Sequence, residues 1–141
     1  MSSSRLSLKL ANELPEIHRM TAELESFCAT RGIPDDACFQ LTLVLDELVT
    51  NVVNYAFDGG RHEISVEIEH KQDGVRAEIV DAGRAFDPLQ RPPPDLTSSL
   101  EDRPIGGLGI HFLRTLMHDV EYQRIDGHNH LRFAKKIERA T

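Results

Sequence analysis

The alternation of apolar and polar residues predicts a strand followed by a helix at the start of the chain. Residues 6–10 alternate with the two-residue period of a half-buried strand. Apolar residues then recur at helical spacing until Gly32, and we expect Asn12 to cap this helix, with Pro15 in its first turn.

A second helix and an antiparallel hairpin follow. The helix begins after residues 33–36 and ends near Phe57, and its apolar residues form a single stripe: Leu41, Leu45, Leu48 and Val52. Residues 64–68 and 75–79 alternate on either side of an Asp73-Gly74 turn, as in two paired antiparallel strands.

The second half of the chain starts with a long segment that has neither period. Residues 82–104 contain a run of consecutive prolines, and such a long loop in a compact domain is usually a lid or a binding loop. A helix opens at residues 106–109, and strands at 120–125 and 131–137 flank an Asp126-Gly127 turn. This order predicts an α+β domain in which helices cover one face of a mainly antiparallel sheet.

Length and charge limit the classes of protein that the sequence can represent. With 141 residues the chain is expected to form one domain over residues 1–141, and its net charge of −7 argues against a direct grip on nucleic-acid phosphates. It has no apolar run long enough to span a membrane and no apolar leader, so we expect a cytoplasmic protein. Cys28 and Cys38 lack the spacing of a zinc site and are expected to be reduced thiols.

Three polar residues of the second predicted helix are candidates for metal or nucleotide chemistry. Glu47, Asn51 and Asn54 lie together on one flank of the apolar stripe. A carboxylate and an amide at positions i and i+4 can hold a divalent cation and hydrogen-bond a nucleophile at the same time. A solvated helix face would have the same pattern.

Two further signals follow the predicted hairpin. Asp81-x-Gly83 ends a strand, where a carboxylate can accept a hydrogen bond from an exocyclic amine such as that of adenine, and glycine permits close backbone approach. Residues 106–109 open a helix with the sequence Gly-Gly-Leu-Gly, where free amides and the helix dipole favour an anion. Taken separately, the first signal also occurs in plain turns and the second in hinges.

Three short motifs together resemble the nucleotide-binding boxes of a known ATPase superfamily. They are Glu47-x-x-x-Asn51, Asp81-x-Gly83 and Gly107-x-Gly109. In order and spacing they resemble the N, G1 and G2 boxes of the GHKL ATPases, which include gyrase, Hsp90, sensor histidine kinases and MutL. Residues 81–88 and 106–110 are most similar to the small stand-alone anti-sigma factor serine kinases of the RsbW and SpoIIAB group. The resemblance covers about residues 6–137 and implies the two-layer α/β sandwich of the Bergerat fold.

The resemblance implies a role for each matching residue. Asn51 would hold magnesium and Asp81 would read adenine, while Glu47 would take the proton from a substrate serine as it attacks the γ-phosphate of ATP. Gly83 would let the nucleotide approach the backbone. The remaining nucleotide-binding positions would be Asn54, Phe86, Gly106, Gly107, Leu108 and Gly109. Residues 90–105 would form the ATP lid.

Three other positions bear on the resemblance. Ala85 stands where the G1 box is expected to have a second glycine, and His130 stands where a threonine of the last strand often lies near adenine. Arg19, in the first helix, lies near the region with which family members bind their substrate protein, and an ordinary exposed arginine fits the sequence equally well.

The sequence therefore predicts a magnesium- and ATP-dependent protein serine kinase. The resemblance implies that it phosphorylates an anti-anti-sigma protein of the STAS fold and sequesters a sigma factor or another target in a partner-switching circuit, as a homodimer. A second hypothesis is a binding module whose partner choice depends on nucleotide but which transfers no phosphoryl group; Glu47 argues against it and Ala85 mildly for it. A protein that binds no nucleotide would require the three motifs to coincide by chance.

Overall fold

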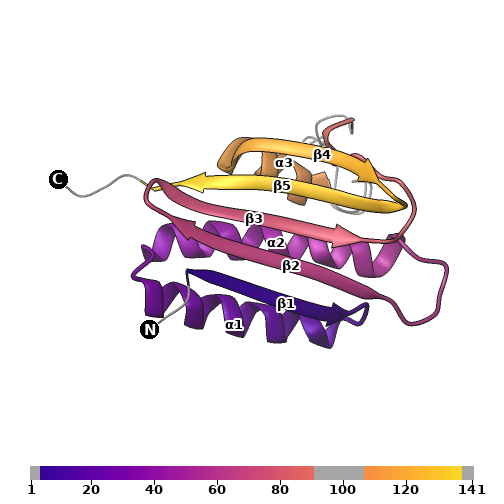
Figure 1. The fold of residues 1–141 in the computed structure, drawn as a ribbon, viewed down its shortest axis with the longest axis horizontal. Coiled ribbons are helices and arrows are strands. Elements are labelled where there is room, and N and C mark those ends of the chain that lie inside the picture. Colours follow the sequence, from indigo (N-terminus) through magenta and orange to yellow (C-terminus); the bar gives the residue numbers. More distant parts are fainter. Residues whose placement is uncertain (1–3, 91–106, 138–141) are drawn as a thin grey trace, which may run out of the picture.

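The computed structural model describes residues 4–90 and 107–137. In chain order the elements are β1 (Arg5–Ala11), α1 (Pro15–Arg31), α2 (Asp35–Tyr55), β2 (Glu63–Lys71), β3 (Gly74–Asp81), the 3-10 helix η1 (Pro88–Gln90), α3 (Gly107–Leu116), β4 (His118–Ile125) and β5 (His128–Lys136). The strands form one five-stranded sheet in the order β1-β2-β3-β5-β4, with antiparallel neighbours throughout. The helices all lie on the same side of this sheet (Figure 1), which confirms the predicted two-layer α+β fold.

The core lies between the helices and the inner face of the sheet. Because successive strand residues point to opposite faces, every second residue of a strand can be buried. The inward residues of the central strands are apolar and buried: Ile64, Val66, Ile68, Ala77, Ile79, Leu131 and Phe133. The predicted stripe of α2 belongs to the same cluster, with Val52 only partly buried.

The start of α1 differs from the prediction. The helix begins at Pro15, its N-cap is Leu14 and no side chain caps it, so the prediction that Asn12 is the cap is wrong. Asn12 instead donates from Nδ2 to the Gly60 carbonyl (3.1 Å) and accepts the His62 amide (2.8 Å), which ties the end of β1 to the loop before β2. Pro15 has no amide hydrogen, so the first turn leaves fewer donors for a cap to satisfy.

The last hairpin is longer than predicted. β5 begins at His128 rather than at residue 131. The turn residues Asp126-Gly127 both have positive φ (51° and 79°), as a two-residue type I′ hairpin turn requires. The additional strand residues matter for the site, because they place Asn129 directly opposite Asp81 of β3.

The segment that leads towards the predicted lid is attached to α3. Arg114 donates to the carbonyls of Pro88 (3.3 Å) and Leu89 (2.6 Å), both of which belong to η1. Of the predicted lid at 90–105, residues 91–105 lie outside the described part of the chain. None of the helices in the described ranges is long and apolar enough to cross a membrane.

Candidate functional site

A cavity of about 320 Å³ opens among α2, the end of β3, the start of β5 and α3. Most of its lining is apolar, including Val52, Ile79 and Leu131. The polar residues in the lining are Asn51, Tyr55, Asp81, Arg84, Tyr122 and Asn129. An apolar cavity with a few fixed polar groups is the usual form of a small-molecule site.

The polar end of the cavity follows from strand periodicity. After the inward residues Ala77 and Ile79, the next inward residue of β3 is Asp81, which is buried. In β5 the inward residue before Leu131 is Asn129, which is also buried. The core face of the sheet therefore changes from apolar to polar at the end of β3 and the start of β5, where Asp81 pairs with Asn129.

Asp81 is held by two hydrogen bonds to the same carboxylate oxygen. Its Oδ1 accepts the Gly83 amide at 2.8 Å and Nδ2 of Asn129 at 3.0 Å. No hydrogen bond from a described residue reaches Oδ2. The carboxylate is thus fixed in orientation and retains one oxygen that can accept a hydrogen bond from a ligand.

Gly83 has a structural reason to be glycine. A Cβ at this position would lie 2.5 Å from Cβ of Ala56, 2.7 Å from its carbonyl oxygen and 2.8 Å from Oδ1 of Asp81. The loop packs this closely on the end of α2 because the Arg84 amide donates to the Ala56 carbonyl (2.9 Å). An ion pair between Arg84 and Asp58 adds a second link between the same segments.

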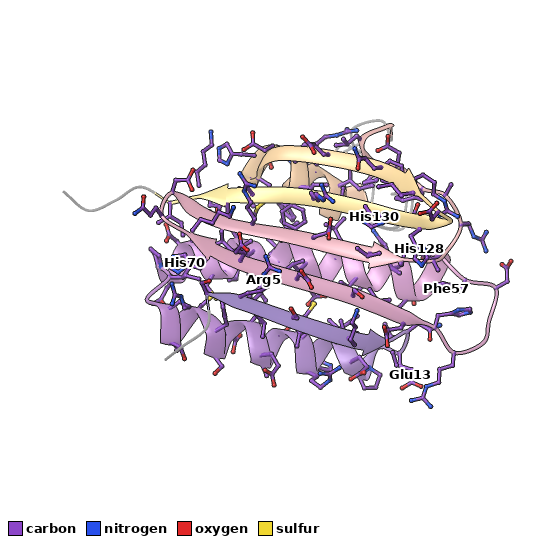
Figure 2. The ribbon with its side chains drawn as sticks, viewed as in Figure 1. Arg5, Glu13, Phe57, His70, His128 and His130 are labelled. Atoms are coloured by element: carbon purple, nitrogen blue, oxygen red, sulfur yellow. The ribbon has the colours of Figure 1, made fainter. Side chains whose placement is uncertain are left out.

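Asn129 is a site residue that the sequence reasoning missed, and it corrects the expectation for His130. His130 pairs with Val80 and lies on the outer face of the sheet (Figure 2). Its Nδ1 is 3.8 Å from Oε2 of Glu78, and it is not part of the cavity lining. The neighbouring Asn129 points inward instead. With β5 beginning at His128, the two-residue alternation through Leu131 and Phe133 makes Asn129 inward-facing.

The predicted residues of α2 separate into two groups. Asn51 lines the cavity, and Glu47 lies one turn earlier with its side chain partly buried. Burial, and secondarily the negative charge of Asp46, raise the pKa of Glu47 above its ordinary value. Asn54 is exposed and outside the cavity lining, whereas its neighbour Tyr55 is part of the lining.

The remaining predicted positions that the structure describes lie in the loop after β3, in α3 and in α1. Phe86 contributes to the lining. Gly107, Leu108 and Gly109 form the first residues of α3, which packs against α2, and Gly106 lies outside the described residues. Arg19 lies on α1, where it donates to Glu16 (2.8 Å) and to the Lys9 carbonyl (2.6 Å) and is absent from the cavity lining.

The side chains at the cavity fit a magnesium ion that is bound together with a nucleotide. In the described ranges no group of three or more His, Cys, Asp or Glu residues could hold a metal by itself. Magnesium is usually bound by one or two protein oxygens together with substrate phosphates and water. Asn51 lines the cavity, and its side-chain amide carries an oxygen of this kind.

A second hollow, of about 550 Å³, lies on the outer face of the sheet. Its charged lining residues are largely paired with one another, as in the ion pairs Arg5–Glu69 and Arg132–Glu78. Exposed pairs of this kind satisfy each other and are well solvated. The cavity at Asp81 is therefore the better candidate for a ligand site.

Comparison with known proteins agrees with this fold. The sequence model of the histidine kinase-like ATPase domain matches residues 10–135. Serine/threonine-protein kinase BtrW of Bordetella bronchiseptica is 42% identical over 95 residues, which are 66% of this chain and 66% of that protein. Serine-protein kinase RsbW of Listeria monocytogenes is 29% identical over 128 residues, which are 87% of this chain and 82% of that protein.

A solved structure shares the architecture. The histidine kinase domain of the blue-light activated histidine kinase EL346 from Erythrobacter litoralis superposes with a TM-score of 0.54 at 13% identity, covering 86% of this chain and 59% of that one. The chain belongs to the histidine kinase-like ATPase domain family. Within the GHKL superfamily it groups with the stand-alone serine kinases of the RsbW type, which confirms the predicted resemblance.

Proposed function

We propose that this chain is an ATP-dependent protein serine kinase that also acts as an anti-sigma factor. The observation that carries the proposal is that one cavity brings together Asp81 and Asn51, which match the adenine and magnesium positions of the family. These residues come from different elements, so only the folded chain unites them. The serine kinases among its relatives support the same reaction.

In the proposed reaction each residue has a separate task. The free Oδ2 of Asp81 accepts a hydrogen bond from the 6-amino group of adenine, and Asn51 supplies an amide oxygen to Mg²⁺. Glu47 removes the proton from the substrate serine as its oxygen bonds to the γ-phosphorus and the bond to the ADP oxygen breaks. The raised pKa of Glu47 suits a general base, since it binds that proton more strongly than an exposed glutamate would.

The proposed protein substrate is an anti-anti-sigma protein with a STAS domain. The proposed sequestered target is a sigma factor or another protein that the phosphorylated substrate no longer displaces. We further propose that the kinase works as a cytoplasmic homodimer and uses Mg²⁺. The RsbW-type kinases among its relatives support the proposed partners.

Intact-mass analysis of a STAS protein from the same organism tests the kinase. After incubation with the chain, Mg²⁺ and ATP, the STAS protein is expected to gain one phosphoryl group. Glu47→Gln should abolish this gain while ATP binding remains near that of the wild type. Asp46→Asn is the matched control, because it neutralises the adjacent exposed carboxylate and should retain transfer.

The alternative is a nucleotide-gated binding module. Ala85, which replaces the expected second glycine of the G1 box, lies in the cavity lining and favours this alternative. A chain that binds ATP and retains its STAS partner but never changes the partner's mass would support it. Phosphorylation of the partner at the same rate by Glu47→Gln would instead remove Glu47 from its role as base.

A further inference from the structure

Asn129 makes the densest set of polar contacts in the described part of the cavity. Its side chain is buried, 6% exposed, beside Asp81 at 5%. Nδ2 donates to Oδ1 of Asp81 (3.0 Å) and to the Arg84 carbonyl (2.9 Å). Oδ1 accepts the Tyr122 hydroxyl (2.5 Å), Nη1 of Arg124 (3.1 Å) and the Phe86 amide (3.4 Å).

These contacts fix the orientation of the amide. The guanidinium of Arg124 and the amide of Phe86 can only donate, so they require the oxygen of Asn129 on their side, and the Tyr122 hydroxyl donates to the same oxygen. The carboxylate oxygen of Asp81 and the Arg84 carbonyl can only accept, so they require the nitrogen on the other side. A flipped amide would therefore oppose donor to donor and acceptor to acceptor.

The same contacts connect the β4–β5 hairpin to the loop after β3. Asn129 holds the loop through Arg84 and Phe86, and Arg124 also donates to the Gly83 carbonyl at 2.7 Å. Asp81 is held by the amide of Gly83 within that loop and by Asn129 from the next strand. Strand β4 thus positions a carboxylate with which it has no direct hydrogen bond.

We propose that Asn129 is the positioning residue that sets the base selectivity of this site, with Tyr122 and Arg124 as the groups that orient it. The inference rests on the proposed binding of ATP at Asp81. Both hydrogens of the Asn129 amide are committed to protein acceptors, so Asn129 offers the base no donor and Asp81 offers it Oδ2 as an acceptor. An acceptor fixed there favours a 6-amino purine and disfavours a 6-oxo purine, whose oxygen would face the carboxylate.

Asn129→Asp tests the positioning role with a readout that a packing role would not change. It has nearly the same shape but replaces the donating amide with a second carboxylate next to Asp81. Two carboxylates at this distance raise the pKa of one of them, although Arg124 partly offsets the repulsion. The groups that face the new carboxylate are Asp81 of β3 and Tyr122 and Arg124 of β4.

The expected results concern affinity, selectivity and pH. At pH 8, Asn129→Asp should bind ATP at least about tenfold more weakly than the wild type, since a donor to a charged group is lost. Its affinity should recover as the pH falls, because a proton shared between the two carboxylates then replaces that donor. The preference for ATP over GTP should narrow at pH 8. Tyr122→Phe, which removes one hydroxyl, should show a smaller loss of about threefold with the same narrowing.

Gln123→Ala is the matched control. Gln123 lies between Tyr122 and Arg124 on β4, is exposed and pairs with His130 on the outer face. The Gln123→Ala variant should bind ATP and GTP with the affinities of the wild type. Calorimetric titration of each folded variant with Mg-ATP and Mg-GTP gives both affinities, and thermal unfolding identifies any variant that does not fold.

The outcomes separate this inference from the proposed function. If the wild type binds no ATP, the proposed function fails and this inference fails with it. If the wild type binds ATP and Asn129→Asp binds it with equal affinity, selectivity and pH dependence, only the role of Asn129 is overturned. If Asn129→Asp does not fold, Tyr122→Phe decides: an ATP affinity and an ATP-over-GTP selectivity equal to those of the wild type would overturn the role of Asn129.

Discussion

At the scale of single residues, the site depends on side chains that their neighbours restrain by hydrogen bonds or by burial. Asp81 is restrained at one oxygen by Gly83 and Asn129, so only the other oxygen can serve a ligand. Glu47 is partly buried on the neighbouring helix, and that burial makes it a better base. Positioning of this kind is the main contribution that a protein makes to phosphoryl transfer.

Substitution of Asn51 should reveal the metal dependence of nucleotide binding. Asn51→Ala removes the amide oxygen that we assign to Mg²⁺, so ATP binding should weaken by about tenfold when Mg²⁺ is present. In EDTA the variant and the wild type should bind ATP equally. Thr50→Ala, one residue earlier on α2 and outside the cavity lining, should match the wild type in both titrations. A deficit of Asn51→Ala that persists in EDTA would refute its role as a magnesium ligand.

The pH dependence of phosphorylation should report Glu47. The base must be ionised, so the rate should fall as the pH drops through the pKa of Glu47, which is raised above the ordinary glutamate value by burial and by Asp46. Asp46→Asn removes a like charge and should move this acidic limb to lower pH. A pH–rate profile under single-turnover conditions measures the shift. A limb that moves to higher pH, or stays in place, contradicts the assignment.

The same raised pKa predicts an effect on stability. A carboxyl group whose pKa is higher in the folded state binds protons more strongly there, so ionised Glu47 destabilises the fold above that pKa. Glu47→Gln should therefore unfold at a higher temperature than the wild type at pH 7, although we expect it to transfer no phosphoryl group. Calorimetric melting at pH 7 checks this, and a lower melting temperature would count against burial of the charge.

At the scale of elements, periodicity accounts for most of what the sequence predicts correctly. The apolar stripe of α2 and the alternation in β2 and β3 predict the two layers, because each of these elements can bury its apolar residues in only one orientation. The start of β5 was misjudged because His128, Asn129 and His130 are all polar. Polar residues at a strand end give no alternation, even though their strand pairing places Asn129 in the cavity.

The junction of β1 and α1 should be sensitive to acid through Glu16. Hydrogen bonds from Arg19 and from the Ala11 amide lower the pKa of Glu16 to about 2. A lowered pKa gives stability that is present above the unfolded pKa and is lost as the pH falls through the folded one.

The melting temperature of Glu16→Gln should therefore lie below that of the wild type at pH 7. The gap should narrow as the pH falls from about 4.5 towards about 2. Glu13→Gln, at an exposed position in the preceding turn (Figure 2), is the control. A gap of constant size across this pH range would show that the ion pair is not its cause.

At the scale of the whole molecule, the sheet has one covered and one open face. The helices cover one side (Figure 1), and the cavity forms where the core beneath them meets the polar ends of β3 and β5. The order of the short motifs indicated the family, but only the three-dimensional structure shows that Asn51 and Asp81 line one cavity. The sequence also gave no signal for the contact between Arg124 and the Gly83 carbonyl, which depends on strand order.

The most direct test of the account is a calorimetric titration of Mg-ATP into the wild type and Asp81→Asn. The wild type should bind, whereas the variant should lose at least about tenfold in affinity. An amide has one accepting oxygen, so it cannot accept hydrogen bonds from Asn129 on one side and from the amino group of adenine on the other. Ala82→Ser, an exposed neighbour, should bind like the wild type. Absence of binding by the wild type, or equal binding by Asp81→Asn, would contradict the claim that this cavity is an adenine nucleotide site.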